Sequence, residues 1–272
     1  MTLSSRTAFI GGGNMASAIV GGCIAHGISA QSIVVVDPNP AQRDALRQQF
    51  GVSSIASANE QLIDCSAVVW AVKPQVLKEV AASTAPFLAK GALHLSVAAG
   101  VSSDSLAAWL GTERIVRAMP NTPALVGHGA TGLYARAAVS SEQRAQVDGL
   151  LAATGLVLWV EDEALLEAVT AVSGSGPAYF FYVMEAMTDA GERMGLPREV
   201  AQRLAIATCT GAGVLAGQSD EPPALLRERV TSKGGSTHEA IEVMRQRDLS
   251  GVIDEAMRAC AARAREMGQL FG

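Results

Sequence analysis

The sequence has few charged and few aromatic residues, and its basic residues are not clustered. Charged residues make up 17% of the chain and aromatic residues 4%, with a formal net charge of -5. A mildly acidic chain without clusters of lysine and arginine lacks the basic surface that binds nucleic acids and anionic membranes. We therefore expect no nucleic-acid partner and no membrane partner.

The chain also lacks paired cysteines and long apolar runs. Its four cysteines, Cys23, Cys65, Cys209 and Cys260, are far apart and form no CxxC pair. This spacing favours free apolar side chains in a reducing compartment over a disulfide or a zinc site, so we expect no metal. The N-terminus lacks the apolar segment of a signal peptide, and no apolar run is long enough to span a bilayer. These features predict a cytoplasmic location.

Histidine-based acid–base machinery is also missing. His26 and His94 have no partner carboxylate at a useful spacing, and His128 and His238 lie in a glycine-rich loop and near a helix start. No Ser/His/Asp order and no metal-ligand spacing stands out. Any catalysis by this protein must therefore depend on groups other than histidine.

The first part of the 272-residue chain alternates strands with helices. Repeated strand–helix units predict a doubly wound, mostly parallel sheet. The run at 67–72, AVVWAV, is continuously apolar, which is typical of a strand covered on both faces. Strands are expected at 7–10, 32–36, 67–72, 94–98, 115–118 and 156–160, and helices at 15–23, 40–49, 75–82 and 103–110. Ser140 and Gln143 fit a capping box for a further helix that ends near Gly155.

After about residue 162 the pattern is helical throughout. Near the C-terminus Ile253, Met257, Cys260, Ala264 and Met267 recur at i, i+4, i+7, i+11 and i+14, which forms one stripe on a helix. The fold class is therefore α/β plus all-α, with expected domains at 1–161 and 162–272. The helical part either packs against a second subunit or forms a self-contained bundle.

A glycine-rich turn links the first expected strand to the first helix. Residues 11–16, GGGNMA, fit the pattern GxGxxA. Gly11 permits a tight turn, Gly13 lets the backbone approach a pyrophosphate, and Ala16 lets the helix lie close to the sheet. The phosphate charge then lies at the helix N-terminus. This context predicts dinucleotide binding by a Rossmann-type domain over 1–161.

Asp37, at the end of the second expected strand, has two interpretations. Its carboxylate can accept a hydrogen bond from a ribose 2′-OH, which favours NAD, and it would repel a 2′-phosphate. It could equally be a solvated residue of the turn DPNP. Arg43 could pair with a phosphate or lie on the helix surface, so the sequence leaves the choice of cofactor open.

Three polar turns lie where ligands bind in such folds. Lys73 follows the third strand, at the carboxyl edge of the sheet, although it could be an ordinary solvated lysine. Asn121 and Thr122 lie between two prolines that make their turn rigid, and both can form hydrogen bonds. Residues 230–237, VTSKGGST, precede a helix and provide a nest for a carboxylate or phosphate. Ordinary N-capping by Ser236 or Thr237 is the alternative.

The most apolar helical stretch is interrupted by poor helix formers. Within residues 171–187, AVSGSGPAYFFYVMEAM, Gly174, Ser175, Gly176 and Pro177 stand together. The interruption is either a plain loop or hinge, or a helix start held open for a ligand.

The chain resembles the pyrroline-5-carboxylate reductase family in six successive stretches. They are FIGGGNMASAI, AVKP, SVAAGV, RAMPNTPALVGHG, AVSGSGPAYFF and VTSKGGSTHEAI, in the family's order and nearly from end to end. Two residues depart from the pattern: Lys233, where the family usually has proline, and Ser236, where it usually has threonine or alanine. Neither change removes a hydroxyl or a glycine that the site would need.

The resemblance implies reduction of 1-pyrroline-5-carboxylate to L-proline, the last step of proline biosynthesis. It favours NADPH, with NADH as the alternative, and a homodimer with interleaved helices or a higher homo-oligomer. A protonated cyclic imine is already a strong electrophile, so the protein needs to orient it more than to protonate it. This would explain the lack of a catalytic histidine.

The resemblance assigns most of the site residues, and the local patterns add Asp37, Asn121 and the hydroxyls and glycines of 232–237. The cofactor-binding residues would be Gly11, Gly12, Gly13, Asn14, Met15, Asp37, Asn59, Ala71, Val72, Lys73, Pro74, Val97, Ala98, Ala99 and Asn121. The catalytic residues would be Ser173, Ser175, Ser232 and Thr237, and the substrate-binding residues Gly174, Gly176, Ser232, Gly234, Gly235, Ser236 and Thr237.

Two rival functions are compatible with this architecture. One is another NAD(P)-dependent imine reductase or a β-hydroxyacid dehydrogenase. The latter enzymes commonly place a catalytic lysine on the helical domain, whereas residues 164–190 contain no lysine. The other is a non-enzymatic nucleotide-binding sensor, which would need no carboxylate nest.

Overall fold

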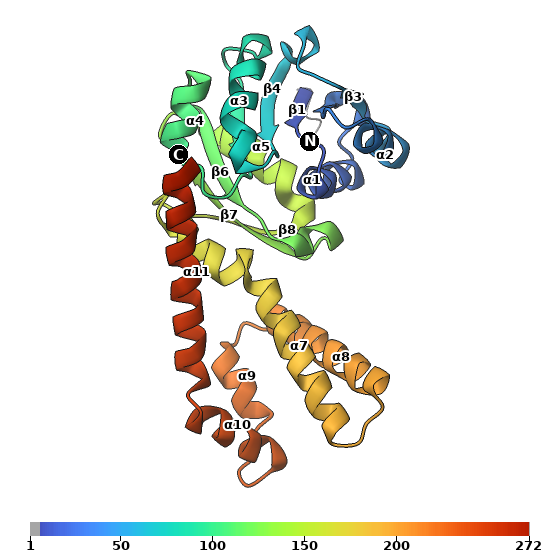
Figure 1. The fold of residues 1–272 in the computed structure, drawn as a ribbon, viewed down its shortest axis with the longest axis vertical. Helices are drawn as coiled ribbons and strands as arrows, with labels where there is room; N and C mark the ends of the chain where they lie inside the picture. The colour runs from blue at the N-terminus through green and yellow to red at the C-terminus, as the bar shows by residue number, and fades with distance from the viewer. Residues whose placement is uncertain (1–5, 272) are drawn as a thin grey trace. The chain divides into compact units, whose positions relative to one another are not determined.

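A computed structural model describes residues 6–271 of the chain. The chain divides into two compact units (Figure 1). Unit 1 comprises the residues up to Ser175 and those from Cys260 onward, and unit 2 comprises Gly176–Ala259.

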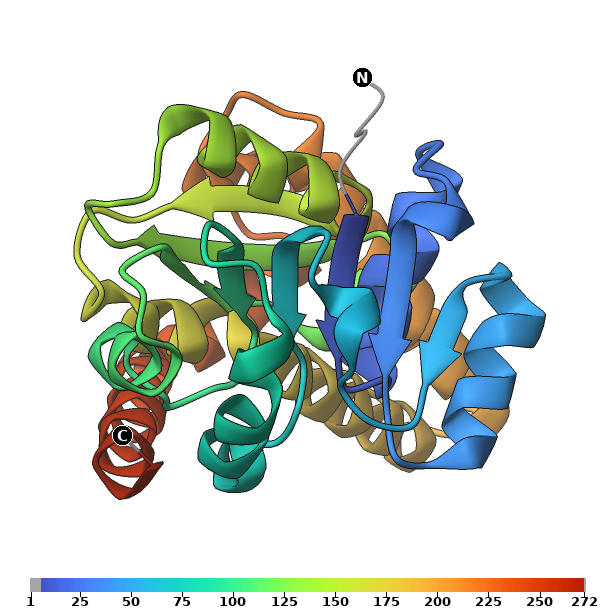
Figure 2. The same ribbon diagram turned by 90° about the horizontal axis from the view of Figure 1, so that it is seen from above.

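Unit 1 is built on a sheet that has eight strands within the described residues, in the order β3-β2-β1-β4-β5-β6-β7-β8. Neighbouring strands are parallel except β6 and β7, which are antiparallel (Figure 2). The order reverses between β1 and β4, which is the switch point where such sheets bind ligands. The strands are β1 Arg6–Ile10, β2 Ile33–Val36, β3 Ser53–Ile55, β4 Cys65–Trp70, β5 Leu93–Ser96, β6 Ile115–Met119, β7 Gly129–Ala135 and β8 Gly155–Trp159.

The sheet is covered on both faces. Helices α1 (Asn14–Ala25), α2 (Pro40–Phe50) and α5 (Ser141–Leu151) bury their apolar sides with one face of the sheet. Helices α3 (Pro74–Thr84) and α4 (Ser103–Leu110) do the same on the other face. Burial on both faces explains the uninterrupted apolar strands, and each fully buried large side chain contributes roughly 1.5–3 kcal/mol.

Several helix boundaries follow the local signals in the sequence. Ser140 and Gln143 form the expected capping box at the start of α5. Gly111 ends α4 in the left-handed conformation, with φ 64°. Helix α5 ends at Leu151, earlier than expected, because a 3-10 turn at Ala152–Thr154 precedes Gly155. The six predicted strands are confirmed with shifts of one or two residues, whereas β3 and β7 were not predicted.

The chain beyond β8 is helical within the described residues. Helix α6 (Leu165–Val169) runs into a π-helical turn at Thr170–Gly174, called η6. Helix α11 (Leu249–Phe271) spans the end of unit 2 and the return to unit 1. Along it Met257, Cys260, Ala264 and Met267 are partly buried, as the predicted stripe requires, whereas Ile253 is 49% exposed.

Unit 2 consists of helices α7 (Gly176–Arg193), α8 (Arg198–Gly217), α9 (Pro223–Arg229), α10 (Ser236–Gln246) and the first part of α11. Helices α7 and α8 pack closely because Gly191 lies against Ala201, where a Cβ would approach to 2.9 Å. The expected domain boundary at 161/162 lies close to the last strand, but the contacts divide the chain later, after Ser175. Within residues 6–271 no helix is both long enough and apolar enough to cross a membrane.

Candidate active site

The turns that were assigned to the cofactor follow adjacent strands of the sheet. Strands β1, β4 and β5 are neighbours, and their carboxyl ends are joined by main-chain hydrogen bonds. The amide of Ala71 donates to Ile10 at 2.8 Å, and that of Val97 donates to Trp70 at 3.1 Å. The sheet therefore brings together the residue groups 11–15, 71–74 and 97–99, which lie far apart in the sequence.

The glycine turn after β1 fits a phosphate group. Gly11 has φ +96°, and a Cβ there would lie 2.6 Å from the carbonyl oxygen of Ala71, so glycine is required. A Cβ at Gly13 would meet nothing within 4 Å, and Gly13 is the N-cap of α1 without a side-chain hydrogen bond. Helices α2, α4 and α5 are each capped by a side chain. The start of α1 therefore keeps backbone N–H groups open toward the site.

Asp37 is tied to this turn. Its Oδ2 accepts a hydrogen bond from the amide of Gly12 at 2.8 Å, and its Oδ1 accepts one from the amide of Asn39 at 2.8 Å. The Arg43 guanidinium donates to the carbonyl oxygens of Asp37 at 2.7 Å and Pro38 at 2.9 Å. The carboxylate thus fixes the glycine turn, and its role toward a ribose stays a prediction.

Two more predicted cofactor residues start helices at this edge. Asn59 caps a 3-10 turn at Glu60–Leu62, where its Oδ1 accepts a hydrogen bond from the amide of Gln61 at 3.0 Å. Lys73 is the exposed N-cap residue of α3, with Pro74 as the first residue of that helix and no side-chain cap. Their contacts with a cofactor also stay predictions.

Asn121 joins the turn after β6 to the interrupted helix. Its side chain is 8% exposed. Its Nδ2 donates to the carbonyl oxygen of Ser173 at 3.0 Å, and its Oδ1 accepts from the amide of Ala130 at 2.9 Å. The sequence placed Asn121 with the cofactor and missed the bond to Ser173, because no local spacing connects residues 52 positions apart.

The interruption itself is a widened helical turn rather than a plain loop. In η6 the amide of Ser175 donates to the carbonyl of Thr170 at 2.8 Å, and α7 begins at Gly176. π-Helical turns of this kind occur frequently at functional sites. The hydroxyl of Ser173 donates to the carbonyl of Val169 at 3.0 Å. Of the residues assigned to catalysis and the substrate, Ser173, Gly174 and Ser175 therefore lie together in unit 1.

The remaining substrate residues lie in unit 2: Gly176 begins α7, and the others lie at the start of α10. Gly234 has φ +73°, and the amide of Gly235 donates to the carbonyl of Ser232 at 2.9 Å. Gly235 is the N-cap residue, without a side-chain hydrogen bond, so neither Ser236 nor Thr237 caps the helix. The exposed start of α10 and its hydroxyls remain available for an anion.

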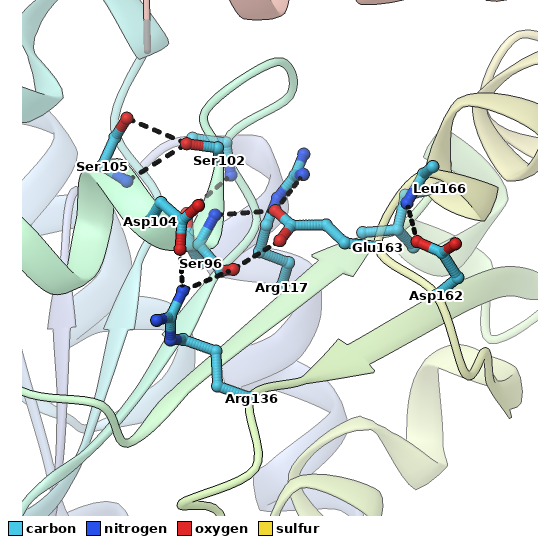
Figure 3. A network of polar contacts seen from close by, with 12 residues as sticks. Ser96, Ser102, Asp104, Ser105, Arg117, Arg136, Asp162, Glu163 and Leu166 are labelled. Atoms are coloured by element: carbon cyan, nitrogen blue, oxygen red, sulfur yellow. Dashed lines mark hydrogen bonds and ion pairs between the residues drawn. The ribbon is translucent and has the colours of Figure 1, made fainter.

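A polar network that the sequence did not reveal holds the start of α6 (Figure 3). The Glu163 carboxylate accepts hydrogen bonds from the amide of Ser103 and from the Arg117 guanidinium, both at 2.7 Å. The side chains of Arg117 and Glu163 are 16% and 24% exposed. Arg136 bonds to Ser103 at 3.2 Å and pairs with Asp104. Glu163 therefore attaches the segment before α6 to both α4 and β6.

The histidine and cysteine side chains of the core show no catalytic arrangement. His94 is 4% exposed, and its Nδ1 accepts a hydrogen bond from Trp70 Nε1 at 3.2 Å. Burial lowers the pKa of His94 to about 4, which keeps it neutral, and burial raises the pKa of Cys23 to about 12. All four cysteines are free, as expected. Within residues 6–271 no group of His, Cys, Asp and Glu side chains is arranged to hold a metal ion.

A doubly wound sheet with a glycine turn and an open helix start at its switch point is the architecture of a dinucleotide-binding protein. Residues 6–100 match the family model described as NADP oxidoreductase coenzyme F420-dependent, and residues 163–267 match the one described as pyrroline-5-carboxylate reductase dimerisation. The chain belongs to the pyrroline-5-carboxylate reductase family. It is 47% identical to the pyrroline-5-carboxylate reductase of Pseudomonas aeruginosa over 268 residues, 98% of each chain.

Solved structures agree with this assignment. A pyrroline-5-carboxylate reductase from Coxiella burnetii has a TM-score of 0.93 and 39% identity, with 97% of this chain and 98% of that chain covered. The Plasmodium falciparum pyrroline carboxylate reductase with NADP bound has a TM-score of 0.84 and 27% identity, with 98% and 100% covered. These findings confirm the family, the fold class and the NAD(P)H-dependent enzyme class predicted from the sequence, and the dimerisation match supports a homodimer.

Proposed function

We propose that this chain reduces the C=N bond of 1-pyrroline-5-carboxylate to give L-proline, with NADPH as the preferred reductant. The observation that carries the proposal is the hydrogen bond between Asn121 Nδ2 and the carbonyl of Ser173. It attaches the turn at Ser173 and Gly174 to the carboxyl end of β6. The glycine turn after β1 lies at the same edge of the sheet. The predicted substrate turn and cofactor turns of unit 1 thus share one edge.

The open start of α1 would hold the cofactor pyrophosphate, with Gly11 and Gly13 leaving room for its approach. Ala71, Val72 and the residues 97–99 would line the rest of the dinucleotide. When bound, the cofactor supplies the hydride that reduces the imine carbon. The protein's own task is to fix the relative position of that cofactor and the substrate.

The substrate carboxylate would bind at the start of α10. The amide of Gly234 and the hydroxyls of Ser232, Ser236 and Thr237 can donate hydrogen bonds to it, and the helix N-terminus favours its negative charge. Small residues at 173–176 leave space for the pyrroline ring. Because these residues fall in two units of a family with a dimerisation domain, the active unit would be a homodimer or a higher homo-oligomer.

The preference for NADPH is supported by the hydrogen bonds that the Asp37 carboxylate already accepts. Both of its carboxylate oxygens accept main-chain hydrogen bonds, so its charge is partly compensated and repels a 2′-phosphate less than a free carboxylate would. The bound nucleotide of the Plasmodium relative is NADP. NADH is the alternative reductant.

Absorbance at 340 nm, with pyrroline-5-carboxylate and each reduced cofactor, tests the proposal. We expect oxidation of the cofactor that depends on the imine and yields proline, with a higher kcat/KM for NADPH. Turnover of a β-hydroxyacid with NADP but not of the imine would replace the proposal with the dehydrogenase alternative. Tight nucleotide binding without turnover of either substrate would support the sensor alternative.

A further inference from the structure

Strand β6 and the turn after it hold the segment 163–174 at three points. Arg117 bonds to Glu163, Met119 lies against Gly174, where a Cβ would be 2.6 Å from the Met119 Cε, and Asn121 bonds to Ser173. These three residues are two positions apart, and Asn121 is extended, with φ -130° and ψ 167°. Alternate residues of an extended strand share one face, so Arg117 and Met119 lie on one face of β6, and Asn121 follows at the same spacing in the turn after the strand.

The third attachment meets a specific need of the backbone. In a regular α-helix the carbonyl of Ser173 would accept a hydrogen bond from the amide of residue 177. That residue is Pro177, which has no N–H group. The amide group of Asn121 supplies the missing donor. Asn121 is buried and Ser173 is partly buried, at the edge of the site. Without the Asn121 amide group, the Ser173 carbonyl would lose its hydrogen-bond donor from the protein.

We propose that Asn121 is a positioning residue for the reductase reaction. Its side chain fixes the π-helical turn Thr170–Gly174 by holding the Ser173 carbonyl, and it keeps the turn against β6 by accepting the amide of Ala130. The residues that flank the substrate then keep a fixed position relative to the edge of the sheet where the cofactor would bind. This inference rests on the proposed function.

Both polar atoms of the Asn121 side chain take part in this task. One N–H of Asn121 Nδ2 and its Oδ1 are engaged by main-chain groups, and the residue is 8% exposed. A buried amide with these two partners is costly to replace, because removing it leaves a carbonyl and an amide without partners. The geometry therefore predicts that changes at Asn121 act through the turn rather than through a direct contact with a ligand.

Asn121→Asp is the most informative variant. The carboxylate still accepts the amide of Ala130 but faces the Ser173 carbonyl without a proton to donate. When the carboxyl is protonated, its O–H restores the donor. The kcat of the variant relative to the unmodified enzyme should therefore rise as the pH falls from 8 to 5.5, by about tenfold or more. A constant ratio across this range would overturn the proposal.

A second test pairs Asn121→Ala with Pro177→Ala. The second change gives residue 177 an N–H group that can donate to the Ser173 carbonyl, so the loss in kcat caused by Asn121→Ala should be smaller in the Pro177→Ala background. Equal losses in both backgrounds would contradict the proposal. If Asn121→Ala does not fold, the aspartate variant alone decides the question.

A readout independent of activity follows the turn itself. Hydrogen–deuterium exchange of the peptide around Ser175, whose amide bonds to Thr170 in η6, should accelerate in Asn121→Ala. Ser140→Ala is the matched control, because it removes the capping box of α5 and lowers stability without touching the turn. It should leave this exchange and kcat unchanged. An inactive unmodified enzyme would count against the proposed function, whereas an active one with unchanged exchange in Asn121→Ala would count against this inference.

Discussion

Units 1 and 2 bury their apolar side chains to very different extents. Unit 1 has two large clusters of buried residues, one on each face of its sheet. In the described part of unit 2, the buried apolar side chains are only Ala201 and Ala205, while Phe180, Phe181 and Leu204 are 60%, 62% and 54% exposed. Unit 1 therefore completes its core within one chain, and unit 2 does not.

The difference explains why the helical half needs a partner. Apolar patches of this extent on a soluble domain mark interaction surfaces. The dimerisation match over 163–267 covers the whole of unit 2, so a second copy of the chain is the expected partner. The site residues follow the same division, because the predicted cofactor turns lie in unit 1 and the predicted carboxylate nest lies in unit 2.

The largest effect should come from a charge placed on the exposed apolar surface of unit 2. Leu204→Glu changes a residue that is 54% exposed in one chain, so a monomeric protein would tolerate it. In a dimer interface it buries an unpaired carboxylate, which costs about 3–5 kcal/mol. We expect dissociation and loss of activity, measured by light scattering and the 340 nm assay.

Ile63→Glu is the matched control for this experiment. Ile63 is 56% exposed but lies in unit 1. It should leave the molar mass of the complex unchanged. If Leu204→Glu also keeps both its molar mass and its activity, the exposed residues of α8 are ordinary surface.

The second prediction tests whether unit 2 supplies the carboxylate anchor. Thr237→Ala removes an exposed hydroxyl in the first turn of α10. The loss of a hydrogen bond to a charged group costs about 1.5–3 kcal/mol, so kcat/KM for the imine should fall roughly 10- to 150-fold. Cofactor affinity, measured by fluorescence titration, should change little.

Thr231→Ala serves as its control, because the Thr231 hydroxyl is already bonded to the carbonyl of Arg227. This variant should keep a kcat/KM close to that of the unmodified enzyme. A loss of the same size in both variants would mean that Thr237 acts through the stability of the loop rather than through the substrate.

The sequence predicted unit 1 well where local signals and tertiary structure agree. The apolar strand Cys65–Trp70 and the helix stop at Gly111 follow directly from residue type. Strand β7, Gly129–Ala135, was missed because its glycines weaken the strand signal. They are required by packing: a Cβ at Gly132 would lie 2.6 Å from Val169, a contact that only the folded chain creates.

The candidate site also has a part that the sequence could predict and a part that it could not. The glycine turn could be recognised from spacing because its function depends on consecutive backbone groups. The bonds of Asn121 to Ser173 and of Arg117 to Glu163 join residues 52 and 46 positions apart. No periodicity encodes such pairs, and they become visible only when β6 and the segment after β8 are placed together.

The third prediction concerns the closed core of unit 1. Burial lowers the pKa of His94 from 6.5 to about 4, so below pH 6.5 the unfolded chain binds a proton that the folded chain does not. The free energy of unfolding should therefore fall as the pH decreases from 6.5 to 5, by roughly 1.5 kcal/mol from this residue. Urea unfolding at several pH values measures it.

His94→Gln should flatten this part of the pH dependence, because glutamine can accept the hydrogen bond of Trp70 but does not titrate. His128→Gln, at an exposed position, is the control and should retain it. An unchanged slope in His94→Gln would assign the acid sensitivity to other groups.

The smallest effect should be at Asp37, on the cofactor half of the site. Its carboxylate accepts two main-chain hydrogen bonds, and Asp37→Asn keeps one acceptor while removing the charge. If that charge faces the 2′ position of the ribose, the ratio of kcat/KM for NADPH to that for NADH should rise by about three- to fivefold, which corresponds to less than about 1 kcal/mol. Asp44→Asn removes the same charge from an exposed position on α2 and should leave the ratio unchanged.

A different outcome, in which Asp37→Asn weakens the binding of both cofactors equally, would mean that Asp37 acts through the hydrogen bond to Gly12 alone. Selection between the two cofactors would then depend on another group, for which the partly buried Arg43 is the next candidate.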